Sequence, residues 1–366
     1  MELNKPRSAD GSATLRRRIT VYRAGLAMLA LLLLAACSSN ESMEVTPPDP
    51  PAVEEPVVSE PEPEPELDGY LAPLTGLLQE QKATQRPIAV MINNNGPARP
   101  QSGLSGADVI WEVLAEGGIT RLVAIYQSQD FPEAIGPIRS IRPYLIELGE
   151  SYEAVLAHAG GSPDAYSILQ KQAKPYLDEI SNAGSSFWRE SFRKAPHNLY
   201  SNLEKLREGI ERRNYRTDVA VPVMRFLDSE ELATGDSATQ IDIRFLLKDY
   251  KVSYSYDEES RLYLRSINDK PHTDMNNDEQ LAAANLVVLG TSHRTLDSEG
   301  RLAVDLDSGG PAMLFRQGTV IEAEWERRGD NFIRILQNGS ELGFVPGKTI
   351  YHIVPMTPTF AEHVVY

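Results

Sequence analysis

The stretch VIWEVLAEGGITRLVAIY, residues 109–126, decides the fold of the first half of this 366-residue chain. Two apolar segments rich in β-branched residues flank the turn at 116–118, which contains two glycines. Glycine adopts the positive φ that a tight hairpin requires, so the pattern predicts two paired strands. A helix is the competing interpretation, because Asp108, Glu112 and Glu116 recur every four residues. The glycines and the β-branched content favour the strands.

The segments around this hairpin alternate between strand and helix patterns. Helix-type spacing of apolar residues and cap signals predict three helices, and short apolar runs predict two further strands. The helices are expected at RPYLIELGESY (142–152), SPDAYSILQKQA (162–173, with Ser162 as the N-cap) and NLYSNLEKLREGIERRN (198–214), and the strands at PIAVMIN (87–93) and EAVLAHAG (153–160). We therefore predict a mixed α/β domain over residues 70–232.

The character of the chain changes after about Thr239. Strand-like runs follow one another and are separated by turn signals such as DEES, RRGDN and QNGSELG. These runs are IDIRFLL, KVSYSYDEESRLYLRSI, NLVVLGT, RLAVDL, PAMLF, TVIEAEWERR, FIRIL and KTIYHIVP. The sequence thus predicts an α/β N-terminal domain followed by a smaller β-rich C-terminal domain over residues 239–360.

The first 36 residues have the pattern of a lipoprotein signal peptide. Arginines precede the apolar run LAMLALLLLAA (26–36), which is shorter than the roughly 20 residues that a membrane-spanning helix needs and suits a signal-peptide core. The run ends in LAAC (34–37), which resembles a bacterial lipobox. Small residues there fit a peptidase cleft, and the thiol of Cys37, the chain's single cysteine, accepts the lipid. We predict cleavage before Cys37 and acylation, for instance by palmitate, on that residue.

Residues 37–69 then form the lipidated cysteine and an acidic, proline-rich linker. Positions 38–69 contain eight prolines and ten acidic residues, with neither Lys nor Arg. Like charges repel each other and proline favours an extended chain, so we expect a stiff spacer. The competing interpretation is a proline-rich recognition ligand for another protein.

The charge of the chain limits its partners. With 36 basic and 52 acidic residues the net charge is −16, which argues against a nucleic-acid partner and against unaided adsorption to anionic lipid. We therefore expect membrane attachment through the N-terminal lipid alone.

A candidate binding site is suggested by the polar residues that crowd the loops between positions 93 and 198. Guanidinium groups gathered near strand ends suit a carboxylate, a phosphate or a sugar acid. The candidates are Arg99, Gln101, Glu116, Arg121, Arg139, Arg142, His158 and His197. In the alternative interpretation the arginines only hold loops together, paired with Asp108, Glu112, Glu116 and Asp164.

Two other functions compete with ligand binding. Glu116, with Glu112 or with His158 and His197, provides the residue types for acid–base hydrolysis of a wall glycan or anionic polymer. An exposed apolar patch would instead indicate a module that binds an envelope protein. None of the six histidines has zinc-site spacing, and no motif assigns a catalytic residue, so we expect neither a metal nor another cofactor.

The same segments resemble the YerB-like lipoprotein family of Gram-positive bacteria. The resemblance covers roughly residues 70–356 and rests on RPIAVMINN, ARPQSGLSGADVIWE, EGGITRLVAIY, IGPIRSIRPY, HAGGSPDAY, APHNLY, GTVIEAEWER and ELGFVPGKTIYHIVP. The resemblance implies a lipid anchor, a position on the outer face of the cytoplasmic membrane and two consecutive exported domains of unknown function. It supplies no reaction. The leading hypothesis is therefore a non-enzymatic binding or scaffolding protein of the cell envelope.

Overall fold

The computed structural model describes residues 69–228 and 234–366. These residues belong to one structural unit of the chain. The predicted signal peptide, Cys37 and nearly all of the predicted linker lie outside the described residues. Within the described ranges, every helix is too short or too polar to cross a membrane.

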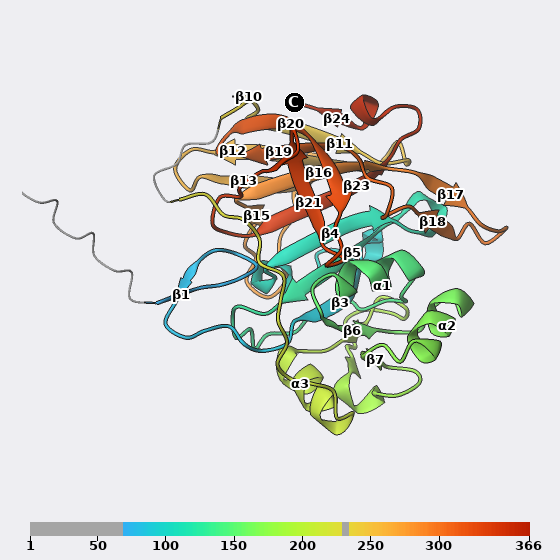
Figure 1. Cartoon of the computed structure of the whole chain (residues 1–366). Helices are drawn as coiled ribbons and strands as arrows, with labels where there is room; N and C mark the ends of the chain where they lie inside the picture. Colours follow the sequence, from blue (N-terminus) through green and yellow to red (C-terminus); the bar gives the residue numbers. More distant parts are fainter. Residues whose placement is uncertain (1–68, 229–233) are drawn as a thin grey trace, which may run out of the picture. The chain divides into compact units, whose positions relative to one another are not determined.

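A central sheet runs through both halves of the sequence. Its order is β22-β21-β20-β19-β16-β23-β4-β5-β3-β6-β7, and β10 pairs with β20 (Figure 1). The strands are β3 (Ile88–Asn93), β4 (Val109–Leu114), β5 (Thr120–Tyr126), β6 (Val155–His158), β7 (Tyr176–Asp178), β10 (Asp236–Ser237), β16 (Asn285–Thr291), β19 (Gly310–Arg316), β20 (Thr319–Arg327), β21 (Ile333–Gln337), β22 (Ser340–Glu341) and β23 (Thr349–Pro355).

The predicted hairpin at 109–126 is confirmed. β4 and β5 pair antiparallel, and Gly117 and Gly118 have φ values of 67° and 75°. The turn closes with a hydrogen bond of 2.7 Å from the Ala115 amide to the Ile119 carbonyl. The helix alternative is wrong, because every residue of both strands is buried, and a helix would have placed its acidic face in water.

One strand pair joins the two halves of the chain in the central sheet. β23, from the C-terminal half, pairs in parallel with β4, so that Ile350 lies opposite Ile110 and His352 opposite Glu112. The predicted N-terminal and C-terminal segments therefore share one sheet and bury a common core. Sequence patterns identified the strands, but nothing in them indicated this pairing.

Three helices occur in the N-terminal half: α1 (Pro143–Glu150), α2 (Pro163–Lys171) and α3 (Leu203–Arg212). The Ser162 side chain caps α2 by accepting from the Ala165 amide at 3.2 Å, as predicted. The third predicted helix, at 198–214, extends beyond both ends of α3. Asn202 caps α3, and Leu199 instead belongs to β9 (Leu199–Tyr200), where its carbonyl accepts from Ile138.

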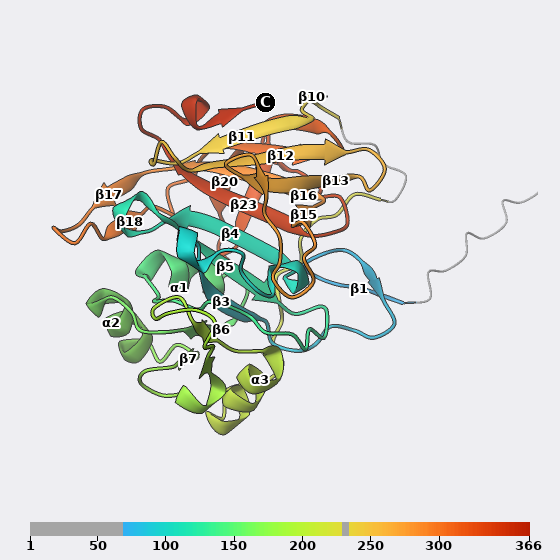
Figure 2. The same ribbon diagram turned by 180° about the vertical axis from the view of Figure 1, so that it is seen from behind.

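A second, six-stranded sheet covers one face of the central sheet (Figures 1 and 2). It contains β11 (Gln240–Arg244), β12 (Lys251–Asp257), β13 (Leu262–Ile267), β14 (Lys270–Pro271), β15 (Ala282–Ala283) and β24 (Val364–Val365). The small pairs are β1 (Tyr70–Leu71) with β2 (Leu78–Gln79), β8 (Trp188–Arg189) with β9, and β17 (His293–Thr295) with β18 (Leu302–Val304).

The two faces of the central sheet bury different partners. Ile88, Val90 and Ile92 of β3 pack in one core with α3 and the six-stranded sheet. Ala89 and Met91, which point the opposite way, pack in a second core with α1 and α2. Alternate side chains of one strand thus serve two apolar layers, which explains the unbroken apolar run of its sequence.

Candidate functional site

A cavity of about 370 Å³ opens at the carboxyl ends of β6 and β7. Its walls are residues 138–140 before α1, 159–161 between β6 and α2, residues 179–180 after β7, and the side chains of Tyr166 and Arg189. The carboxyl ends of parallel strands are the usual location of ligand sites in α/β sheets. β3, β6 and β7 are parallel here, so the cavity has that setting.

Asp178 shapes the wall of the cavity from beneath. The carboxylate is fully buried and accepts from the Gly160 amide at 2.8 Å, the Tyr166 hydroxyl at 2.8 Å and the Ser181 hydroxyl at 2.7 Å. Burial alone would raise the pKa of Asp178, but these hydrogen bonds outweigh it and lower the pKa. The ionised Asp178 therefore holds the 158–161 loop in place and does not present itself to a ligand.

Arg139 is the predicted residue that the cavity exposes. Within the described ranges its Nε is buried without a hydrogen-bond partner. Burial and the nearby charge of Arg142 lower the pKa of Arg139, while Glu116 opposes them. A buried donor without a partner is costly. An anion in the cavity would therefore supply the negative charge that the guanidinium of Arg139 lacks.

Arg121 and Arg142 add positive charge behind Arg139. Arg142 is paired with Glu116, and this contact lowers the pKa of Glu116 against the raising effect of burial. Arg121 is buried and donates to the Ser140 carbonyl. Burial and the charge of Arg142 lower the pKa of Arg121 to about 10, which still leaves it charged at neutral pH. Three guanidinium groups therefore share the single carboxylate of Glu116.

His197 lies at the edge of this group. Its Nδ1 accepts from the Asn93 side chain at 2.8 Å. Burial, Arg139 and Arg193 all lower the pKa of His197, so the imidazole is neutral at neutral pH. The cavity's other arginine, Arg189, is bound to Glu179 at 3.1 Å, and it therefore contributes less free charge than Arg139.

Of the eight predicted residues, only Arg139 is part of the cavity lining, and three of the other seven are engaged elsewhere in the fold. His158 is fully buried beneath it, donates from Nδ1 to the Gly160 carbonyl at 2.9 Å, and has a pKa lowered to about 4, chiefly by burial. Arg99 lies over the ring of Tyr250, 5.4 Å from its centre. Gln101 is fully buried.

The structure also separates the arginines from most of the acidic residues proposed to neutralise them. Of the four acids, only Glu116 pairs with a candidate arginine. Asp108 instead accepts from the amides of Gln127 and Ser128. Glu112 forms its ion pair with Arg265, from the second half of the chain.

Comparisons with known proteins agree with this architecture. Residues 74–216 match the model described as the N-terminal domain of a protein of unknown function, DUF3048, and residues 241–350 match its C-terminal domain. A curated relative from Bacillus subtilis, named "Putative lipoprotein YerB", is 39% identical over 286 residues, which are 78% of this chain and 86% of the relative. The chain belongs to the YerB-like DUF3048 family.

A solved structure of a family member has the same fold. The crystal structure of YerB from Bacillus subtilis superposes with a TM-score of 0.74 at 36% identity, covering 81% of this chain and 99% of the other. The family resemblance inferred from the sequence motifs is thereby confirmed. Two consecutive family domains are present, and in this chain they contribute strands to one continuous sheet.

A buried polar cluster joins the two family domains, and sequence reasoning missed it. Glu112 of β4 is fully buried and pairs with Arg265 of β13 at 2.7 Å. The other oxygen of Glu112 accepts from Tyr250 at 2.5 Å and from Thr120 at 2.7 Å. Burial alone would raise the pKa of Glu112, but Arg265 and the other partners hold it well below its usual range.

Arg265 extends the cluster to two buried histidines. Its Nε donates to Nδ1 of His272 at 2.9 Å, so Nε2 of His272 carries the hydrogen and donates to Gln101 at 2.6 Å. His352 places Nδ1 at 3.1 Å from Glu112 and Nε2 at 2.9 Å from the Tyr254 hydroxyl. Burial lowers the pKa of both histidines, so both are neutral and their tautomers are set by these partners.

No local motif could have revealed this cluster. Glu112 and Arg265 are 153 positions apart, and each sits in a strand whose other residues are apolar or follow ordinary alternation. The only available signal was a glutamate in the middle of the apolar run VIWEVL, where a charge must have a buried partner.

Proposed function

We propose that this protein is a lipid-anchored, extracytoplasmic protein of the cell envelope, and that the cavity beside Arg139 binds an anionic group of an envelope ligand. The observation that carries the binding proposal is the buried, unpartnered Nε of Arg139 at the cavity wall. The proposal for the anchor rests on the LAAC sequence at 34–37 and on the lipoprotein name of the Bacillus subtilis relative.

Replacing Cys37 by serine should release the protein from the membrane fraction. Serine preserves the shape of the residue but removes the thiol that accepts the lipid. Cells expressing the whole chain would be fed a clickable palmitate analogue and fractionated. The native chain should carry label and sediment with membranes, whereas Cys37→Ser should carry none. Label that persists in Cys37→Ser would refute lipidation at this residue.

The charge distribution around the cavity favours a carboxylate or phosphate over a neutral group. The charge of Arg142 lowers the pKa of both Arg121 and Arg139, so the three guanidinium groups lie near one another, and Glu116 is the carboxylate beside them. At about 0.15 M salt the screening length is about 8 Å, so these groups outweigh the acidic surface farther away. Guanidinium forks also match the paired oxygens of a carboxylate or phosphate.

Anionic sugars should raise the unfolding temperature of the whole chain, purified in a mild detergent. Glucuronate and glucose 6-phosphate would be compared with glucose, which has the same ring without the charge. A ligand at 100 times its dissociation constant should stabilise the fold by about 2.7 kcal/mol. The effect should disappear in Arg139→Ala and persist in Arg328→Ala, which removes an exposed arginine paired with Glu326. An equal response to glucose, or a full response in Arg139→Ala, would contradict the proposal.

Glycan hydrolysis is the less favoured function. A hydrolase needs two titratable groups that face one open cleft. Glu112 is fully buried in the polar cluster with Arg265 that joins the two family domains. Glu116 is paired with Arg142, and His158 is fully buried. These contacts argue against acid–base chemistry by the predicted groups, whereas the arginines around the cavity support the binding of an anion.

A further inference from the structure

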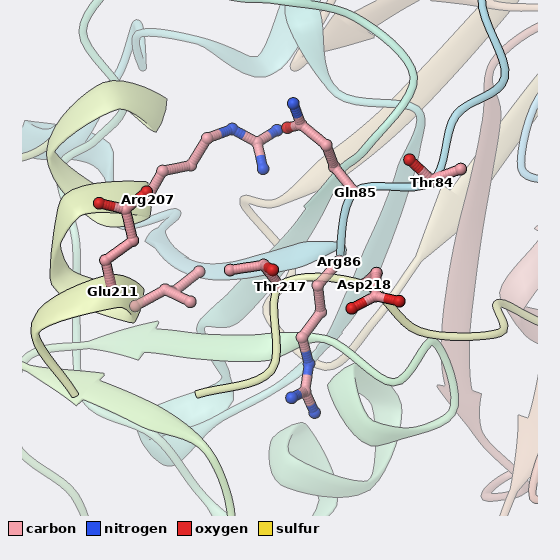
Figure 3. Close-up of a pocket in the computed structure, with 8 residues that line it drawn as sticks. Thr84, Gln85, Arg86, Arg207, Glu211, Thr217 and Asp218 are labelled. Atoms are coloured by element: carbon pink, nitrogen blue, oxygen red, sulfur yellow. The ribbon is translucent and has the colours of Figure 1, made fainter. Parts of the chain in front are cut away.

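A second cavity, of about 310 Å³, lies between α3 and the chain entering β3. Its volume is at the lower end of the range for small-molecule sites. The walls are residues 84–86, 217–218 and one side of α3 (Figure 3). It shares no lining residue with the cavity beside Arg139, so it constitutes a separate candidate site.

Arg207 is the free cation of this cavity. In the part of the chain that the structure describes, its guanidinium has no hydrogen bond or ion pair, and burial lowers its pKa while Asp130 opposes that effect. Figure 3 shows the guanidinium directed toward the side-chain amide of Gln85. The neighbouring Arg86 points away and donates to the Glu153 carbonyl at 2.6 Å. The guanidinium of Arg207 therefore offers several donors to one anionic group.

Two carboxylates on opposite sides of the same cavity provide the complementary charge. Glu211 follows Arg207 by one turn of α3, and Asp218 lies on the facing segment (Figure 3). Neither side chain makes an ion pair within residues 69–228 and 234–366. Thr84 and Thr217 add neutral hydroxyls to the lining. The lining therefore combines one unpaired guanidinium with two unpaired carboxylates.

We propose that this cavity binds the amino-carboxylate group of a free amino acid, with the carboxylate on Arg207 and the ammonium on Asp218, while Glu211 adds negative charge to the rim. A carboxylate alone would face two negative side chains, and an amine alone would face Arg207. A zwitterion satisfies both, because the guanidinium fork matches a carboxylate and an ammonium carries three donors. This site is independent of the anion site beside Arg139.

The test is a calorimetric titration of the whole chain in detergent with three matched compounds. Alanine carries both charged groups, propionate lacks the ammonium and ethylamine lacks the carboxylate. Alanine should bind in the millimolar range or tighter, and each of the other two should bind at least about 10-fold more weakly. Equal binding of propionate or ethylamine, or no binding of alanine, would overturn the proposal.

Variants locate the binding. Arg207→Ala and Asp218→Asn should each weaken alanine binding by at least about 10-fold. Arg213→Ala, which removes an exposed arginine at the end of the same helix, should leave it unchanged. Unfolding curves of the variants check that the fold is intact. Alanine binding that survives Arg207→Ala in a folded variant would show that the ligand sits elsewhere.

Discussion

Replacing Arg265 by methionine should lower the free energy of unfolding by about 3–5 kcal/mol, the usual cost of removing one partner of a buried ion pair. The side chain is 2% exposed and its partner Glu112 is fully buried. Methionine fills similar space but leaves the carboxylate of Glu112 without its counter-charge. It also removes the donors to His272 and Tyr254. Since total stability of a domain is commonly 5–15 kcal/mol, the variant should be close to unfolding.

Urea unfolding followed by tryptophan fluorescence measures this loss, because Trp111 and Trp325 are buried in the core. The matched control is Arg328→Met, which breaks an exposed pair with Glu326 and should cost well under about 1 kcal/mol. The double variant Glu112→Gln with Arg265→Met should be more stable than Arg265→Met alone, because the isolated charge is gone. A single variant as stable as the control would show that the pair does not hold the two family domains together.

Mild acid should destabilise the protein steeply. The pKa of His158 is lowered to about 4 and that of His272 lies well below its usual range, in both cases chiefly through burial. The unfolded chain takes up protons near pH 6.5, whereas the fold keeps these rings neutral. Stability is therefore full above pH 6.5 and falls as the pH drops toward the folded-state pKa. Each histidine contributes about 1.4 kcal/mol per pH unit, so the two together give roughly 3 kcal/mol per unit.

The measurement is a series of urea unfolding curves between pH 7.5 and pH 5, an interval chosen around the ordinary histidine pKa of about 6.5. His352 acts in the same direction, because burial lowers its pKa as well. The variant His158→Asn keeps a donor for the Gly160 carbonyl and should reduce the slope by about 1.4 kcal/mol per pH unit. His197→Asn, which changes a half-buried ring, should reduce it less. A stability that is flat across this interval would mean that the buried histidines accept protons in the fold.

Local patterns predicted most of the secondary structure, because the forces involved act over a few residues. The Gly117-Gly118 turn, the Ser162 cap and the alternation in the strands of the second half each depend on neighbours in the chain. The error at Leu199 has the same origin. Helical spacing extended the pattern backward, and only the Asn202 cap and the hydrogen bond from Ile138 show where the helix begins.

From the sequence, the loops that line the candidate site could be predicted, but the side chains that face the cavity could not. The segments containing Arg139, Gly160 and Pro196 do line one cavity. Arg99 and Gln101, assigned to the same set, belong with the domain-spanning cluster instead. Sequence patterns indicate which loops carry polar residues, but the direction of each side chain depends on the packing around it.

By itself, the sequence determined the family, the hairpin at 109–126 and the strand-rich second half, and it predicts the lipobox at Cys37, since each is encoded in contiguous residues. Only the tertiary structure decided that β23 joins β4, that Glu112 meets Arg265, and that Arg139 faces a cavity while His158 is sealed below it. These facts depend on contacts between residues far apart in the chain. A charged residue within an apolar strand, such as Glu112, indicates from the sequence that a buried partner must exist. Which residue is the partner depends on the order of the strands in the fold.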